Sequence, residues 1–334
     1  IGFESTAHYA LNLELFLENA HHSFMEVNPV LIKEYKKSTT LRRTKTDSVD
    51  CESIARWLIT VEYKPHSKGF YHAYSLKSLT RLRDRLIRQR SFYLVKITNV
   101  LDHTFPEFKP FFNERLSKTA LYLLENYGSA EKMARMNSAS YDKLRCISRG
   151  KFSIQQFLRL KELAANTVGV NNSIFDLELN TLLTLYKSLS DEINTLETEI
   201  IKLIEEVHPH YMSIPGIGPI SSAVIYAEYG DISNFSNPGQ MLAFAGIEPG
   251  INDSGTESHG GRMVKHGSSQ LRYVLLNACL PLIRFDLTFA TYYEKKRAEG
   301  KKHRVAITHV AKKLIRVIYA LERQDVDFNA QKLR

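Results

Sequence analysis

The chain has 334 residues, a hydrophobic content of 43% and a formal net charge of +9 at pH 7. This composition excludes a disordered chain, and the length allows about two or three domains with their own cores. The positive charge favours a polyanionic partner, nucleic acid first and an anionic membrane surface second. No apolar run approaches the roughly 20 residues that a membrane span needs, and no signal peptide is visible. With three cysteines and no close pair among them, we expect a cytoplasmic protein without disulfides or a membrane partner.

Residues 1–60 alternate predicted strands and helices, which is the rhythm of an α/β fold. The segments IGFE and HSFMEV predict short strands, and AHYALNLELFLEN has helical periodicity. Pro29 opens a second helix, since proline is favoured at the first helical position. Thr46 predicts the N-cap of a third helix over DSVDCESIARWLI. The i, i+3 spacing of Asp47 and Asp50 then puts both carboxylates on one face of that helix.

From about residue 75 the pattern becomes helical. The segment SLKSLTRLRDRLIRQRSFYLVKITNVLDHTF predicts one long helix that carries a run of arginines, among them Arg81, Arg85 and Arg88. We expect these three side chains to contact nucleic-acid phosphates, RNA more than DNA. A solvated basic face is the alternative. Residues 117–165 predict several short helices with polar joints.

Residues 182–207 hold the clearest periodic signal in the chain. Apolar residues recur there at alternating steps of four and three, without Pro or Gly, at Leu182, Tyr186, Leu189, Ile193, Leu196, Ile200, Leu203 and Val207. Such a heptad seam predicts a coiled coil. It pairs either between chains, as a homodimer or tetramer, or within the chain as an antiparallel helical hairpin. We expect it to hold protomers together.

The C-terminal stretch after His208 and Pro209 is predicted to be mostly helical and rich in Lys and Arg. The turn P-G-I-G-P at 215–219 lies between apolar helices and resembles a helix-hairpin-helix element. In such an element glycines let backbone N–H groups approach a phosphate. A plain interhelical turn is equally compatible with this sequence.

Three carboxylates near the start predict a metal site. Glu4 lies where the first predicted strand ends, a position that often faces a functional crevice in α/β sheets. Mg²⁺, or Mn²⁺ in its place, prefers oxygen ligands and is held by a few carboxylates plus substrate phosphate oxygens. We therefore predict Glu4, Asp47 and Asp50 as ligands for two-metal phosphodiester chemistry. An isolated pair of aspartates on a helix is more often plain surface charge.

Residues 252–272, NDSGTESHGGRMVKHGSSQLR, show no apolar period. We predict a polar, Gly-rich loop that runs into a helix at about Ser268. Composition alone makes Ser254 a turn serine. The cations that follow it are Arg262, Lys265 and Arg272. They are predicted to bind nucleic acid and to cradle a scissile phosphate, where they would stabilise the charge of a pentacovalent transition state.

Four segments together resemble one family along nearly the whole chain. They are GFESTAHYALNL, NPVLIKEYKKSTTLRRTKTDSVDCESIARWL, IPGIGPISSAVIYAEYGDISNFSNPGQMLAFAGIEPG and DSGTESHGGRMVKHGSSQLRYVLLNA. In this order they resemble the DEDD-type transposases of the insertion-sequence-110 family, to which pilin-gene invertases are related. The resemblance implies a fold that is mixed α/β at first and mostly helical afterwards. It comprises a partial RuvC-like, RNase H-type domain at 1–74, a helical and coiled-coil region at 75–208, and a C-terminal transposase domain at 209–334.

The resemblance also implies roles for single residues. Glu4 matches the glutamate of the DEDD set, and Asp47 and Asp50 match its last two aspartates. The first aspartate of the family belongs to an opening strand that this sequence lacks, so we expect a chain truncated at its N-terminus. Ser254 matches the family's serine nucleophile.

The function implied is that of a prokaryotic DNA transposase or site-specific recombinase of an insertion sequence, acting at the nucleoid. It would cut and rejoin DNA through a metal–carboxylate site and a serine nucleophile, with a structured bridge RNA as its guide. Two alternatives stay open. A RuvC-like metal-dependent DNA nuclease needs the carboxylates but not Ser254, and a non-catalytic nucleic-acid-binding fragment needs neither.

Overall fold

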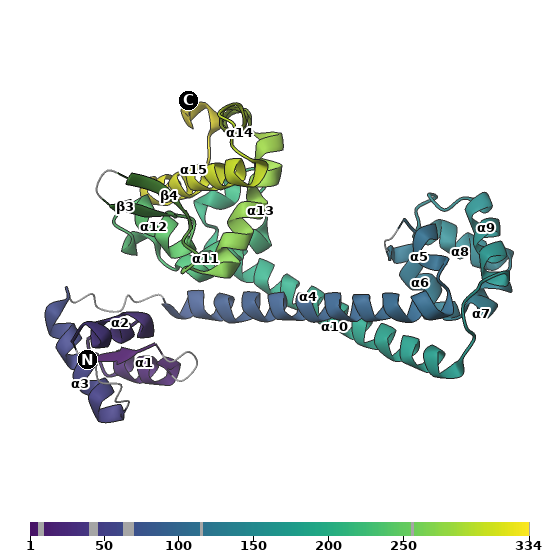
Figure 1. Cartoon of the computed structure of the whole chain (residues 1–334), viewed down its shortest axis with the longest axis horizontal. Helices are drawn as coiled ribbons and strands as arrows, with labels where there is room; N and C mark the ends of the chain where they lie inside the picture. The colour runs from purple at the N-terminus through teal and green to yellow at the C-terminus, as the bar shows by residue number, and fades with distance from the viewer. Residues whose placement is uncertain (6–9, 40–45, 63–69, 114–115, 255–256, 334) are drawn as a thin grey trace. The chain divides into compact units, whose positions relative to one another are not determined.

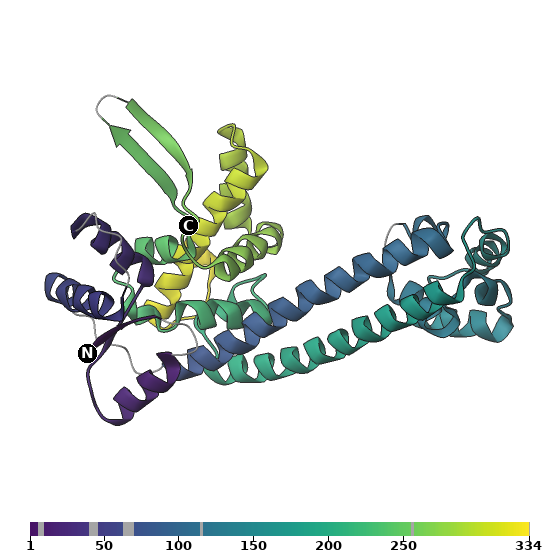
Figure 2. The same ribbon diagram turned by 60° about the horizontal axis from the view of Figure 1, so that its bottom comes forward.

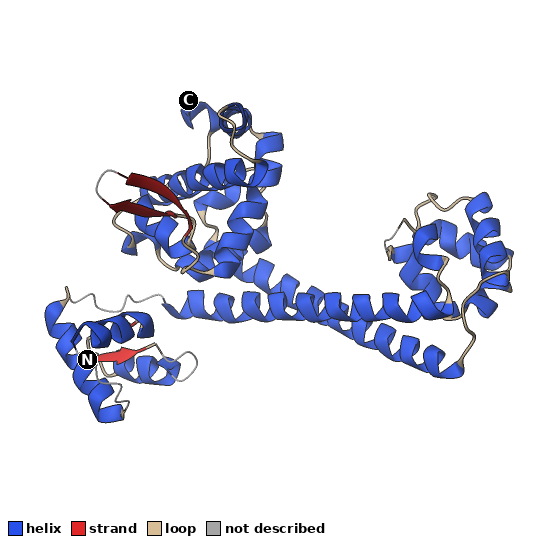
Figure 3. Ribbon diagram, viewed as in Figure 1, coloured by secondary structure: helices blue, strands red, loops and turns tan. Residues whose placement is uncertain are grey.

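The computed structural model of the chain describes residues 1–5, 10–39, 46–62, 70–113, 116–254 and 257–333. Side chains of residues 249–262 lie outside this description, although the backbone of both strands there is described. The chain divides into two compact units, Ile1–Tyr71 and His72–Arg334, which we call the first and second units and treat separately. Helices dominate both of them (Figure 3).

The first unit has the predicted α/β order. Its elements are β1 (Gly2–Glu4), α1 (Ala10–Asn19), β2 (Met25–Val27), α2 (Pro29–Thr39) and α3 (Asp47–Thr60). The two strands are parallel, with Gly2 opposite Met25 and Glu4 opposite Val27, so that α1 is the crossover of a β-α-β unit. In the described residues of this unit the sheet has two strands. The α/β start is thus confirmed, whereas the RuvC-like sheet stays a prediction.

Helix α3 packs closely against the first strand. A Cβ atom on Gly2 would lie 2.2 Å from Cδ1 of Leu58, so only glycine lets the strand and the helix approach this far. The predicted cap is also present, because the Thr46 side chain accepts a hydrogen bond from the Val49 N–H at 3.4 Å. The carboxylate-bearing end of α3 is therefore fixed by the local sequence.

Two long helices, α4 (Phe70–Thr104) and α10 (Ser173–Val207), run antiparallel and side by side in the second unit (Figures 1 and 2). Ile200 of the predicted heptad seam is fully buried in a cluster with Leu76 of α4 and with Ile204, Ala223 and Ala227. This end of the seam therefore packs within the chain, as in the hairpin alternative. Pairing between chains remains a prediction.

A small helical group joins the two long helices. Its members are α5 (Phe108–Phe111), α6 (Lys118–Tyr127), α7 (Ala130–Ala134), α8 (Ser138–Ile147) and α9 (Ile154–Ala165). The last four begin at Ser or Asn caps whose side chains accept a backbone N–H, at Ser117, Ser129, Asn137 and Ser153. The group has its own core around Leu123, Leu144 and Leu160. The predicted series of short helices is confirmed.

The C-terminal part is a helical cluster around α15 (His303–Gln324), whose Val310, Leu314 and Ile318 are fully buried. The elements that precede it are η2 (His210–Ser213), α11 (Pro219–Tyr229), η3 (Ile232–Asn234), α12 (Pro238–Ala245), β3 (Pro249–Ser254), β4 (Glu257–Met263), α13 (Ser269–Phe285) and α14 (Leu287–Ala298), and η4 (Ala330–Leu333) follows it. No single helix among the described residues is long and apolar enough to cross a membrane. Helices α13 and α14 satisfy that test only as a pair bent by 106°.

The predicted loop at 252–272 is wrong over most of its length. Strands β3 and β4 form an antiparallel hairpin there, with Asn252 opposite His259 and Ser254 opposite Glu257. The hairpin was missed because its residues are polar on both faces, and a strand then shows no alternation of apolar and polar residues. The helix expected at about Ser268 does begin there, with Ser268 as the N-cap of α13.

Candidate active site

Glu4 is the last residue of β1, and its side chain is half-buried. The parallel ladder continues one step past it, since the Ser5 N–H donates to the Val27 carbonyl at 2.9 Å. This pairing fixes the backbone of Glu4 at the carboxyl end of the strand. The strand-end position predicted for this carboxylate is therefore confirmed.

Asp47 and Asp50 both lie in the first turn of α3. The positive end of the helix dipole favours negative charge there, which stabilises both carboxylates. Asp47 is exposed, whereas the Asp50 carboxylate forms an ion pair with the Lys36 ammonium of α2. Lys36 was not identified from the sequence, because a lysine on the neighbouring helix has no sequence signal that distinguishes it from other surface lysines.

The donor set fits a divalent cation in chemistry, since a glutamate and two aspartates offer only carboxylate oxygens. In the described part of the chain, however, no three His, Cys, Asp or Glu side chains come close enough together to hold a metal ion. The described geometry therefore places two of the carboxylates on one helical turn and the third at a strand end. It does not bring the three together as a metal site.

Ser254 is the last residue of β3, and it pairs with Glu257, the first residue of β4. The structure describes the backbone of Ser254, Ser258, His259 and Arg262 but not their side chains. The backbone still gives a location. The predicted nucleophile is at the far end of a two-stranded arm rather than in an irregular loop (Figure 2).

The base of this arm is fixed by two glycines. A Cβ on Gly267 would lie 2.0 Å from the Phe244 carbonyl oxygen and 2.5 Å from the Gly246 nitrogen. Gly246 itself has a φ of +65°, a backbone conformation that residues with a side chain rarely adopt. The Val264 N–H also donates to the Glu248 carbonyl at 2.8 Å. Close backbone packing thus holds the start and the end of the hairpin together.

The predicted cations that follow Ser254 have different surroundings. Lys265 is exposed and available to a ligand. Arg272 is half-buried, and its Nη1 donates to the Ala245 carbonyl at 3.2 Å, at the carboxyl end of α12. A cation at that end of a helix is favoured by the helix dipole. Arg272 therefore has a structural contact, and its binding to nucleic acid stays a prediction.

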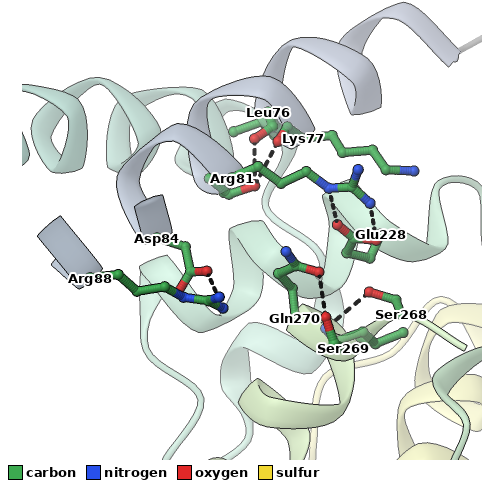
Figure 4. A network of polar contacts seen from close by, with 11 residues as sticks. Leu76, Lys77, Arg81, Asp84, Arg88, Glu228, Ser268, Ser269 and Gln270 are labelled. Atoms are coloured by element: carbon green, nitrogen blue, oxygen red, sulfur yellow. Dashed lines mark hydrogen bonds and ion pairs between the residues drawn. The ribbon is translucent and has the colours of Figure 1, made fainter. Parts of the chain in front are cut away.

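Arg81 of the long basic helix is held by a carboxylate of α11 (Figure 4). Its Nε donates to Oε1 of Glu228 at 2.9 Å, and its Nη2 donates to Oε2 at 3.1 Å. Glu228 is only 4% exposed, so this pair joins α4 to the C-terminal helices. The sequence did not identify Glu228, because its partner is 147 residues away.

The pKa of Glu228 lies below its usual range despite its burial. Burial pushes the pKa of this carboxyl upward, but the hydrogen bond from Arg81, the charges of Lys77 and Arg81, and a hydrogen bond from Ser268 outweigh it. Ser268 is also the N-cap of α13. The hydrogen-bonded pair of Arg81 and Glu228 thus connects α4 with α11.

The other two predicted arginines differ from Arg81. Arg88 pairs with Asp84 one turn earlier on the same helix at 2.7 Å, and 72% of its side chain is exposed. Arg85 is exposed and makes no ion pair or hydrogen bond with any residue that the structure describes. Of the three, Arg85 is the one whose guanidinium is open to a phosphate.

The P-G-I-G-P turn lies before α11, which begins with Pro219 at its first position. Gly216 has a φ of +95°, and a Cβ there would lie 2.9 Å from Cγ of Pro281 in α13. The glycine is thus required by the backbone conformation and by helix packing. A phosphate-binding role for this turn stays a prediction.

Two family models match the chain. One, for DEDD-type transposases of IS110, matches residues 1–106, and the other, described as the Transposase IS116/IS110/IS902 family, matches residues 209–294. Together they cover more than half of the chain and include Glu4, Asp47, Asp50 and Ser254. The helical group between α4 and α10 lies outside both matches.

Curated relatives give the same assignment. The chain is 27% identical to the insertion element IS110 43.6 kDa protein of Streptomyces coelicolor, over 71% of this chain and 60% of that protein. It is 28% identical to the insertion element IS900 42 kDa protein of Mycobacterium paratuberculosis, over 84% of this chain and 71% of the relative. It is 25% identical to the transposase for insertion sequence element IS1111A of Coxiella burnetii, over 77% and 59%. The match thus spans less than two thirds of the first and the third of these proteins.

The DEDD-type model matches the start of the chain and the other model its C-terminal part, and an alignment that covers 84% of the chain, as with the IS900 protein, reaches into both matched ranges. The DEDD-type match indicates a protein family that depends on divalent metal ions. The chain belongs to the IS116/IS110/IS902 family of transposases.

Proposed function

We propose that this protein cuts and rejoins DNA as the transposase of an insertion sequence. The observation that carries the proposal is the pair of family matches, one over the carboxylates of the first unit and one over the hairpin with Ser254. A net charge of +9 and an exposed Arg85 on the long helix agree with a polyanionic substrate.

The proposed nucleophile is Ser254. Its Oγ attacks the scissile phosphorus, the bond from phosphorus to the deoxyribose oxygen breaks, and the leaving oxygen takes up a proton to become a hydroxyl group. The serine proton passes to solvent or to a neighbouring base. A phosphoseryl–DNA link results, and attack by a DNA hydroxyl in the reverse sense rejoins the strand and frees the serine. Because one phosphodiester replaces another, no high-energy cofactor is needed.

The carboxylates of Glu4, Asp47 and Asp50, which the described geometry leaves apart, would have to move together to hold a divalent cation, Mg²⁺ or Mn²⁺. A bound cation of this kind neutralises charge on the phosphate oxygens and orients the phosphodiester. The contribution of the chain is to present the two aspartates on one turn of α3. The ion pair with Lys36 orients the Asp50 carboxylate before the cation binds.

The partners that we propose are DNA, a bridge RNA from the same element, and further copies of this chain. Lys265 and Arg85 are the predicted contacts that are exposed and make no ion pair or hydrogen bond with a residue that the structure describes. Association of protomers would use the exposed apolar side chains of α10, since Leu177 and Leu185 of this helix are 68% and 40% exposed.

The test is a Ser254→Ala variant incubated with labelled DNA and run on a denaturing gel. The variant should lose both cleavage and the covalent adduct, because alanine has no oxygen that can attack phosphorus. Ser254→Cys should retain a trace of activity, since a thiol is a competent but larger nucleophile. Ser258→Ala and Ser269→Ala are matched controls from the same segment and should retain the adduct.

Peptide mapping of the adduct decides between the reactions. An adduct on Ser254 supports the transposase mechanism, whereas an adduct on a different residue overturns it. Full cleavage by Ser254→Ala, still dependent on Asp47 and Asp50, would support the RuvC-like nuclease instead. Binding of DNA without any cleavage would support the other alternative, a non-catalytic nucleic-acid-binding fragment.

A further inference from the structure

A cavity of about 350 Å³ lies between α4, α11 and α13 in the second unit. Ile87, Val224 and Val274, one from each helix, give it an apolar lining, and Arg88, Gln270 and Tyr273 add polar groups. Figure 4 shows Arg88 and Gln270 at this junction, beside the pair of Arg81 and Glu228. The cavity is distinct from the carboxylates of the first unit and from the hairpin that carries Ser254.

Tyr273 is the most unusual lining residue. It is 68% exposed although it lies on a helix whose opposite face is fully buried at Leu271 and Leu275. Its ring makes no stacking or cation–π contact with any residue in the described part of the chain. An aromatic ring beside a cavity, without a partner of its own, offers a flat face on which a planar ligand can stack.

The polar groups around the ring match the edge of a planar ligand that carries donors and acceptors. The Gln270 carboxamide offers both kinds of group, and among the described residues its Oε1 accepts a hydrogen bond from Ser269 alone, at 3.1 Å. The Asp84 carboxylate also lines the cavity and is held by Arg88 at 2.7 Å. Both lining arginines have a carboxylate partner, Arg83 with Glu197 and Arg88 with Asp84, but 72% of the Arg88 side chain is exposed, so its guanidinium remains accessible to an anionic ligand.

From this lining we propose that the cavity takes one unstacked base of a single-stranded nucleic acid. The base would stack on Tyr273, its edge would face Gln270 and Asp84, and the following phosphate would lie near Arg88. Bases splayed out of single strands are recognised in this way, by stacking on aromatic rings together with hydrogen bonds to their edges. A volume near the lower limit for ligand pockets suits one base rather than a duplex or a folded peptide.

The inference rests on the proposed function only in naming nucleic acid as the ligand class. The same chemistry is presented by single-stranded RNA, such as a guide, and by a DNA strand opened during recombination. The 2′-hydroxyl distinguishes the two sources. A binding measurement without Mg²⁺ separates the cavity from the strand-cutting reaction, because it requires neither Ser254 nor the carboxylates.

The experiment measures fluorescence anisotropy of labelled single-stranded 12-mers, one set of RNA and one of DNA, each made of a single base. We expect Tyr273→Ala to weaken binding about tenfold, the effect of losing one base–aromatic stack. Tyr273→Phe should bind nearly as the wild type does, because the ring remains. Phe285→Ala is the matched control, since it removes an equally exposed aromatic ring from the other end of the same helix.

Salt dependence gives a second and independent readout. A stacked base releases no counterions, so Tyr273→Ala should lower the affinity without changing the slope of log K against log salt concentration. A changed slope, an unchanged affinity, or an equal loss in Phe285→Ala would each overturn the proposal. Equal binding of RNA and DNA supports a base site that does not distinguish ribose from deoxyribose. Tighter binding of RNA supports a guide RNA as the source of the bound base.

The outcomes also separate this inference from the proposed reaction. If Tyr273→Ala binds the 12-mers weakly while wild-type protein forms no adduct at Ser254, the cavity proposal is supported and the serine mechanism is refuted. If the adduct forms and Tyr273→Ala binds every 12-mer as the wild type does, the mechanism stands and the cavity proposal is refuted.

Discussion

Arg81 and Glu228 form a two-point contact between helices that are far apart in sequence. Two nitrogens of the guanidinium donate to the two carboxylate oxygens, at 2.9 and 3.1 Å. The carboxylate is almost fully buried, whereas 46% of the arginine side chain is exposed. Such bidentate pairs fix geometry as well as charge, and this one fixes α4 against α11.

We therefore expect Arg81→Ala to destabilise the second unit by about 1–3 kcal/mol. The loss comes mainly from leaving the Glu228 carboxylate buried without its partner, and exposure of Arg81 keeps it below the value for a fully buried pair. Glu228→Gln should cost less, because an amide carries no charge to bury. Urea unfolding followed by circular dichroism measures both, with Arg85→Ala as the surface control. Equal midpoints for Arg81→Ala and Arg85→Ala would refute this role.

Arg85 provides the clean test of nucleic-acid binding by the long basic helix. Removing it should leave stability within about 0.5 kcal/mol of the wild type, since it has no partner among the described residues. If it contacts a phosphate, the slope of log K against log salt for single-stranded RNA should fall by about 0.7. Filter binding at several salt concentrations measures the slope. An unaltered slope would assign this position to a solvated basic face.

Lys36 competes with a metal cation for Asp50. Replacing it with methionine should raise the affinity for Mn²⁺ about two- to fivefold, which corresponds to the loss of a partly exposed ion pair. Asp50→Asn should have the opposite effect, because a neutral amide is a poorer ligand than a carboxylate. Titration followed by electron paramagnetic resonance of free Mn²⁺ gives both affinities. Weaker Mn²⁺ binding by the Lys36→Met variant would contradict the competition.

We expect the heptad seam to stabilise the fold of the single chain, whether or not protomers also associate through α10. Ile200 is fully buried, so Ile200→Ala should cost about 2–5 kcal/mol of unfolding free energy. Leu185→Ala, at a 40% exposed position of the same helix, should cost far less. If protomers associate through α10, Leu177→Glu with Leu185→Glu should lower the mass measured by light scattering and leave the melting temperature nearly unchanged. A mass that stays the same would exclude this face of the helix as the interface.

His210 links η2 to the chain that follows α15. Its ring nitrogens lie 3.0 Å from Asp327 and 2.8 Å from Asp325, and these hydrogen bonds, Asp327 first, raise the pKa of His210 above its usual value. A raised pKa in the folded state stabilises the fold below the unfolded pKa, and this stability is lost as pH rises through the folded pKa. We expect His210→Gln to lower the melting temperature at about pH 6 by a degree or so and to have little effect at about pH 9. A difference that grows with pH would reverse the assignment.

Local rules in the sequence predicted the helix starts that depend on a single turn. Thr46 caps α3 as predicted, and Pro29 opens α2, because caps and proline act within a single turn. The heptad period predicts a long helix over 182–207, and α10 extends it to Ser173. The β3–β4 hairpin was missed because no periodic signal exists for a strand that is polar on both faces.

Tertiary structure decided which charged side chains remain open to a ligand. From sequence alone Arg81, Arg85 and Arg272 are three equivalent cations. In the fold, Arg81 is held by Glu228, Arg272 donates to the end of α12, and only Arg85 is left exposed without a described partner. The reason is physical. A charge is set by the residue type, but whether that charge is neutralised depends on groups that folding brings within about 3 Å from distant parts of the chain.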